Sequence, residues 1–141
     1  MPSIVEVRHF GRLSLPPNGA IAGGQIVAGV VVSGVDCAAI AGANAKNVLG
    51  VCLLDCDTLA DVGAVIPLEA FPAQVLCSVG AHGEYPVTYA AGATIGTPLV
   101  AGANGTVQPY VASSSTFDEI IGYCTQTTLT GAIGTAYIGP N

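Results

Sequence analysis

The chain has 141 residues, of which 51% are hydrophobic and only 9% are charged, and its formal net charge is −6. The length predicts one domain with a conventional hydrophobic core. Three basic residues against nine acidic ones exclude nucleic acid as a partner, because such binding needs Lys and Arg to displace counterions. The charged fraction is far below the roughly 25% of an average soluble domain, so we expect other protein to cover much of the surface.

Nineteen glycines and nine prolines are scattered along the chain, and no segment shows helical apolar periodicity beyond about two turns. This pattern favours an all-β fold, a small barrel or sandwich of short strands. The apolar stretch Ala20–Val35 is shorter than the roughly 20 residues of a membrane helix and is interrupted by glycines. We interpret it as core strands and expect no membrane association.

The N-terminal segment differs from the rest of the chain. Ser3–Phe10 alternates like an extended strand, and Gly11 with Pro16-Pro17 separates it from the body of the domain. The sequence therefore predicts an extended arm over residues 1–18 and a single β-rich domain over residues 19–141. The segment is either the first strand of the domain's own sheet or an arm that adds a strand to a partner.

Further elements are expected along the chain. We expect a helical turn at Cys37–Ala41 and a polar loop at Asn44–Asn47. We expect strands at Gln25–Val32, Asn47–Leu54, Ala64–Leu68, Gln74–Val79, Tyr85–Tyr89, Ile120–Cys124 and Gly134–Ile138. Asn104-Gly105 predicts a tight hairpin turn, because both central residues of a type I′ turn need positive φ.

Two sequence blocks recur in the same order. Ile26–Gly29 aligns with Leu99–Gly102 at an offset of 73, and Asn47–Cys52 aligns with Glu119–Cys124 at an offset of 72. Each block pair is an apolar-Ala-Gly corner followed by an apolar-apolar-Gly-x-Cys strand. The recurrence predicts two related β-units.

Candidate chemical residues are few. Asp55 and Asp57 come after an apolar strand, but Leu59 and Ala60 break the patterns of a phosphatase nucleophile, an aspartic protease and a calcium loop, so we interpret them as an acidic corner. His82 with Glu84 could act as a general base, but their Gly-flanked position favours a solvated hairpin tip.

The five cysteines lack CxxC spacing, and we expect them to be reduced and buried. A metal site from Cys52, Cys56 and His82 would need an unpredicted convergence. We therefore assign no catalytic, cofactor or metal residues.

The recurring corners, Gln25–Gly29 and Pro98–Gly102, and the strands Val48–Cys52 and Ile120–Cys124 together resemble the head decoration, or capsid cement, proteins of tailed bacteriophages. The likeness covers roughly residues 19–139. It implies a compact β domain, a homotrimer at three-fold and quasi-three-fold positions outside the capsid, and the major capsid protein as partner. It also implies a virion location after synthesis in the host cytoplasm, and stabilisation of the shell against genome pressure.

Family members often reach the shell with an N-terminal arm. On this chain the expected capsid contacts are Ile4, Val5, Val7, Arg8, His9, Phe10 and Arg12. The alternative is a lipoyl- or biotinyl-like carrier domain with Lys46 as the modified residue. Its neighbours Ala45 and Asn47 differ from the acidic or methionine flanks of those families.

Overall fold

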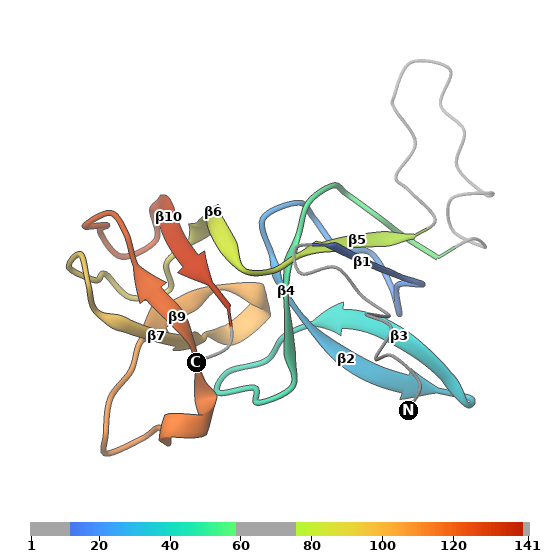
Figure 1. The fold of residues 1–141 in the computed structure, drawn as a ribbon, viewed down its shortest axis with the longest axis horizontal. Helices are drawn as coiled ribbons and strands as arrows, with labels where there is room; N and C mark the ends of the chain where they lie inside the picture. Colours follow the sequence, from blue (N-terminus) through green and yellow to red (C-terminus); the bar gives the residue numbers. More distant parts are fainter. Residues whose placement is uncertain (1–11, 59–75, 140–141) are drawn as a thin grey trace, which may run out of the picture.

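The structure, a computed structural model, describes residues 12–58 and 76–139, which form two five-stranded antiparallel sheets side by side (Figure 1). The sheets are not closed into a barrel, so the all-β prediction is confirmed as a sandwich-like fold. The first sheet has the order β1-β5-β4-β2-β3 and the second β6-β10-β9-β7-β8. The strands are β1 (Arg12–Leu15), β2 (Ile26–Val32), β3 (Val35–Ile40), β4 (Val48–Cys52), β5 (Cys77–Gly80), β6 (Gly83–Thr88), β7 (Pro98–Ala101), β8 (Val107–Pro109), β9 (Ile120–Cys124) and β10 (Ile133–Ile138).

The helical elements of the described ranges are two short 3-10 turns, η1 (Ala103–Gly105) and η2 (Phe117–Glu119). Neither approaches the length of a membrane span, and within residues 12–58 and 76–139 no helix is suited to one.

The two sheets are copies of one arrangement. β1, β5, β4, β2 and β3 of the first unit (residues 12–58 and 76–81) correspond in order to β6, β10, β9, β7 and β8 of the second unit (residues 82–139). Val27 pairs with Gly50, and Leu99 pairs with Gly122, so both strands keep an offset of 72. The predicted pseudo-repeat is confirmed.

The predicted alignment of the first block is wrong by one residue. Strand register places Val27, and not Ile26, on Leu99. The difference matters because a slip of one residue exchanges the two faces of a strand. Val27 packs in the core of its own unit, whereas Ile26 packs in the cluster that also contains the second unit's residues.

A glycine bulge marks the same place in both units. Register shifts by one residue opposite Gly50 in β4 and opposite Gly122 in β9. A Cβ atom on Gly50 would lie 2.0 Å from the carbonyl oxygen of Gly80, and one on Gly122 would lie 1.8 Å from that of Tyr137. The glycine of the apolar-Gly-x-Cys pattern is therefore required at both sites, because two backbones approach too closely there for any side chain.

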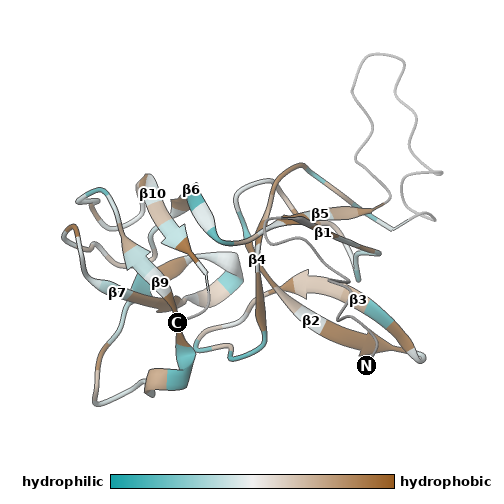
Figure 2. Cartoon of the chain, in the orientation of Figure 1, coloured by the Kyte–Doolittle hydropathy of each residue, from teal (hydrophilic) through white to brown (hydrophobic). Residues whose placement is uncertain are grey.

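The core has two parts. Both draw on β2 and β4, which carry hydrophobic colour in Figure 2. One cluster lies within the first unit and includes Val27, Cys52 and Val79. The larger cluster joins Ile26 and Val51 of the first unit to the buried residues of the second. The first unit therefore depends on the second to cover one face of its sheet.

The predicted helical turn is wrong, whereas the predicted strands that fall on described residues are confirmed. Cys37–Ala41 is not a helical turn, because Val35–Ile40 forms β3 and pairs along its length with β2. The predicted strands at 25–32, 47–54, 74–79, 85–89, 120–124 and 134–138 each overlap an observed strand, and Ala64–Leu68 lies outside the described residues. Asn104 and Gly105 have φ of 56° and 74° and connect β7 to β8, which confirms the predicted hairpin.

The end of the predicted arm lies in the sheet. β1 pairs with β5, and Pro17 forms a bridge to Ala38. Residues 12–17 therefore belong to the first unit, whereas residues 1–11 lie outside the described part of the chain.

Candidate functional site

The expected capsid contacts fall at the N-terminal end. Ile4, Val5, Val7, Arg8, His9 and Phe10 lie outside the described residues. Arg12 begins β1 and pairs with Gly80 of β5. In the sequence, the expected contact segment therefore directly precedes β1, an edge strand of the first sheet.

Lys46 forms an ion pair between the two units. Its Nζ lies 2.9 Å from Oδ2 of Asp118, with both side chains more than half exposed. The hydrogen bond to Asp118 raises the pKa of Lys46, whereas hydrogen bonds from Thr116 and then Lys46 lower the pKa of Asp118. The amine proposed for the carrier alternative is thus engaged by a partner within the chain.

Asp55 and Asp57 both accept hydrogen bonds from backbone amides. Oδ1 of Asp55 accepts from the amide of Gly23 at 2.8 Å, and Oδ1 of Asp57 accepts from the amide of Thr58 at 2.7 Å. These contacts hold the turn before β2 and the segment after β4, which agrees with their interpretation as an acidic corner.

His82 and Glu84 lie at the junction of the units. His82 has φ of 53° and directly precedes β6, while Glu84 lies within β6 and not in a turn. Oε1 of Glu84 accepts a hydrogen bond from the Thr125 hydroxyl at 3.0 Å. Glu84 therefore occupies an exposed position in a strand, and the prediction that it lies at a hairpin tip is wrong.

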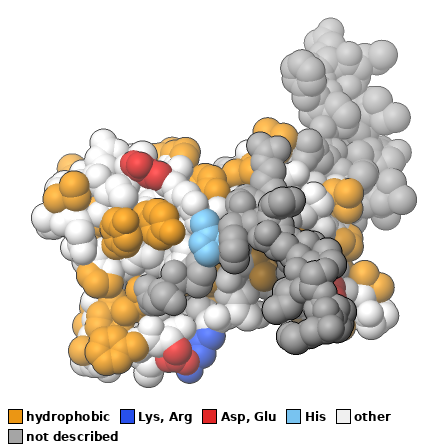
Figure 3. Space-filling model, in the orientation of Figure 1, with side chains coloured by type: hydrophobic (Ala, Val, Ile, Leu, Met, Phe, Trp, Pro, Cys, Tyr) orange, Lys and Arg blue, Asp and Glu red, His pale blue; other side chains and the backbone are white. Residues whose placement is uncertain are grey.

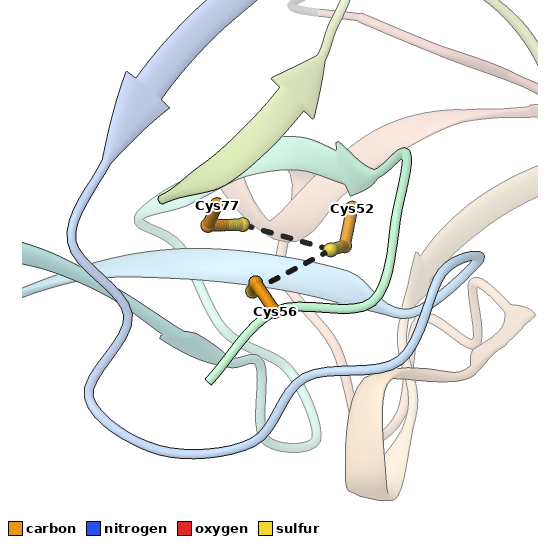
Figure 4. A group of neighbouring side chains, drawn as sticks. All are labelled: Cys52, Cys56 and Cys77. Atoms are coloured by element: carbon orange, nitrogen blue, oxygen red, sulfur yellow. Dashed lines mark hydrogen bonds between the residues drawn. The ribbon is translucent and has the colours of Figure 1, made fainter. Parts of the chain in front are cut away.

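Three buried thiols meet inside the first unit (Figure 4). The Sγ atom of Cys52 lies 4.0 Å from that of Cys56 and 3.6 Å from that of Cys77. The combination of Cys52 and Cys56 with His82 was considered from the sequence and not predicted. In the structure Cys77 joins Cys52 and Cys56, because pairing of β4 with β5 brings Cys77 close to Cys52. All five cysteines of the chain are buried and unpaired, as expected.

Electrostatics separate the three thiols. A hydrogen bond from Cys77 stabilises the Cys52 thiolate and lowers the pKa of Cys52 to about 7. Burial and then the neighbouring Cys52 charge raise the pKa of Cys56 to about 11, and the hydrogen bond to Cys52 and burial raise the pKa of Cys77.

The thiol cluster offers a soft metal ion three sulfur ligands. A structural zinc site takes four protein ligands, and the cluster gathers three His, Cys, Asp or Glu side chains among the described residues. All three cysteines belong to the buried core cluster of the first unit, and we interpret them as core packing.

The second unit has different side chains at the positions that correspond to the thiol cluster. The counterparts of Cys52, Cys56 and Cys77 are Cys124, Thr128 and Gly134. A Cβ atom on Gly134 would lie 1.9 Å from Oγ1 of Thr128, so the threonine occupies the room that Cys77 takes in the first unit.

A row of aromatic side chains crosses the second sheet, and sequence reasoning missed it. Backbone pairing puts Tyr137, Tyr123 and Pro98 side by side, and the amide of Tyr110 bonds to the Pro98 carbonyl at 2.8 Å. The rings of Tyr123 and Tyr137 stack at 5.1 Å between centroids, and those of Tyr110 and Phe117 stack at 5.5 Å. We call Tyr110, Pro98, Tyr123 and Tyr137 the aromatic row.

Much apolar surface is exposed. Phe117 is 78% exposed and Tyr123 47% exposed, and Figure 3 shows hydrophobic side chains spread over the second unit with few charged ones. A second exposed group lies at the β2–β3 turn, where Val31 and Val35 are 66% and 52% exposed. We call Val31, Val32 and Val35 the valine tip. Aromatic residues on an open sheet face are typical of protein interfaces.

Comparison with known proteins identifies the fold. This chain is similar to a bacteriophage head protein. The solved structure of the head fiber gp8.5 N base in bacteriophage phi29 matches it with a TM-score of 0.62 and 16% sequence identity, over 90% of this chain and 92% of that chain. No protein family and no curated protein sequence matches the chain.

The extent of the match covers both units. Ninety per cent of the chain cannot be aligned without both sheets, so the shared fold includes the two-unit arrangement. At 16% identity the likeness concerns backbone architecture and not the side chains of the valine tip or the aromatic row.

Proposed function

We propose that the protein is a structural component of a phage virion. It binds the outside of an icosahedral head as a homotrimer at three-fold and quasi-three-fold positions, contacts the major capsid protein, and stabilises the shell against genome pressure. The observation that carries this proposal is the near full-length fold match to a head fiber base.

The surface supports the proposal. Charged residues are scarce, and large hydrophobic side chains are exposed on both units. Such a surface suits a protein that is largely covered once it has assembled. The N-terminal segment that includes Ile4, Arg8 and Phe10 precedes edge strand β1 in the sequence, and it supplies the proposed contacts with the shell.

Stabilisation results from linkage. A protein that binds the assembled shell and not its separated subunits stabilises the shell by about 2.7 kcal/mol per site when its free concentration is about 100 times its Kd. Many sites act together on one head, so the force needed to split it rises.

The test is sedimentation of the purified protein with heads that lack it. We expect saturable co-sedimentation and a higher rupture temperature for the decorated heads. A chain shortened by residues 1–11 should keep its fold but bind more weakly, whereas Leu129→Asp, a change at an exposed turn, should bind like wild type. Folded wild-type protein that ignores heads would contradict the proposal.

A further inference from the structure

One row of the first sheet is covered by the second unit. Pairing places Gly80, Val51 and Ile26 side by side, and the amide of Ala41 bonds to the Ile26 carbonyl at 2.9 Å. All four residues are buried. Small and aliphatic side chains here leave room for the neighbouring unit.

The covering elements come from both ends of the second unit's sheet. A Cβ atom on Gly80 would lie 2.7 Å from the Tyr85 hydroxyl, so Tyr85 packs over this end of the row. At the other end η1 packs against β2: the Gly105 amide donates to the Ala41 carbonyl at 3.0 Å, and Nε2 of Gln25 donates to the Asn104 carbonyl at 3.2 Å. The β7–β8 connection of one unit thus caps the row of the other.

The same row of the second unit has no such cover among the described residues. By the register of the repeat, Gly80, Val51, Ile26 and Ala41 correspond to Tyr137, Tyr123, Pro98 and Tyr110, which form the aromatic row. Pro98 and Tyr123 are exposed, and the row holds three of the chain's five tyrosines. A face that is buried in one copy of the fold is open and aromatic in the other.

The element that would cover it is also open. The β2–β3 connection of the first unit corresponds to the β7–β8 connection of the second. Equivalent residues of β2 and β7 are 72 positions apart in the sequence, whereas equivalent residues of β3 and β8, such as Ala38 and Val107, are 69 positions apart. The first unit's hairpin is therefore longer and carries the valine tip. Figure 1 shows it projecting at the end of the molecule away from the second sheet.

We propose that the valine tip of one copy packs on the aromatic row of a second copy of this chain. The contact continues, from one chain to the next, the interface that already joins the two units within each chain. The tip exposes three valines, with Asp36 paired to Val31 as its charged residue, and the row exposes Pro98 and Tyr123 between the partly exposed Tyr110 and Tyr137. The two surfaces differ, so each copy offers one of each.

Such a contact is heterologous and closes into a ring if its rotation permits. The number of copies rests on the proposed function: with three, the ring contains six units in alternating order. The tip-to-row pairing itself does not depend on a phage role.

The test uses two single-surface variants of the full chain. Val31→Asp breaks the tip, and Tyr123→Asp breaks the row, with Tyr123→Ser as a milder second change. Each should weaken self-association by about thirty-fold or more, the effect of losing a hot-spot contact, when measured by sedimentation velocity. Leu129→Asp, at a residue more exposed than either Val31 or Tyr123 but outside both surfaces, should assemble like wild type.

Mixing gives the decisive result. Equal amounts of the tip variant and the row variant retain one intact tip and one intact row between them, so the mixture should form one-to-one dimers that neither variant forms alone. Folded variants that assemble like wild type, or a mixture that stays monomeric, would overturn the proposal. Variants that assemble normally but lose head binding would assign the row to the capsid and also overturn it.

The same samples separate this inference from the proposed function. If wild type forms the ring, and the variants and their mixture behave as expected, but nothing co-sediments with heads, then the interface stands and the phage role fails.

Discussion

Gly122→Ala should be among the most damaging single-methyl changes in the protein. The new Cβ would lie 1.8 Å from the Tyr137 carbonyl oxygen, whereas Cβ atoms essentially never approach within 3.0 Å of another heavy atom. The obstacle is backbone of the adjacent strand, so it cannot rotate away. β10 must move from β9, which strains the packing and weakens one or two of the ladder hydrogen bonds, at a cost of about 3–5 kcal/mol.

The assay is urea unfolding followed by circular dichroism at one fixed protein concentration, since any self-association would make stability depend on concentration. With a slope of about 1–3 kcal/mol per molar urea, the midpoint should fall by more than about 1 M. Gly131→Ala is the control, because its φ is 79° and a Cβ there meets nothing within 4 Å. It should cost only about 1–2 kcal/mol, the penalty for a left-handed residue. A Gly122→Ala protein as stable as this control would refute the close-approach argument.

Three further predictions concern side-chain contacts. Gly134→Ala should cost about 2–3 kcal/mol because its Cβ meets Oγ1 of Thr128, and Thr128→Ala should remove most of that cost; additive losses in a double-mutant cycle would count against the contact. Hydrogen bonds from Thr116 and Lys46 hold the Asp118 pKa below its ordinary value, so they stabilise the fold above the unfolded pKa and the benefit is lost as pH falls through the folded one. NMR titration should show the Asp118 pKa rising in Lys46→Met, and an unchanged pKa would dismiss the pair. The five thiols are buried, so a thiol-reactive dye should label them slowly in buffer and rapidly in urea. A thiol that is labelled equally fast in both would contradict its buried position.

Turn chemistry and strand composition were readable from the sequence. Asn104-Gly105 specified its hairpin because positive φ is a local requirement, and the recurring Gly-x-Cys strands revealed two units. The offset of the first block was misjudged because Ile26 resembles Leu99 more closely than its true counterpart, Pro98. Residue similarity reflects the environment, and the environment of Ile26 is set by the other unit.

The functional surfaces were harder to predict. Cys77 joins Cys52 only through the pairing of two strands separated by a long connection, which no spacing rule encodes. The aromatic row consists of residues from four different segments, each unremarkable alone. Only their alignment across the sheet shows that three tyrosines share one face.

The doubled architecture gives the molecule a polarity that a single unit would lack. At matching sites, the unit whose row is internal carries Val51 and Gly80, whereas the other unit carries Tyr123 and Tyr137. Two units with one backbone plan thus present a distinct front and back.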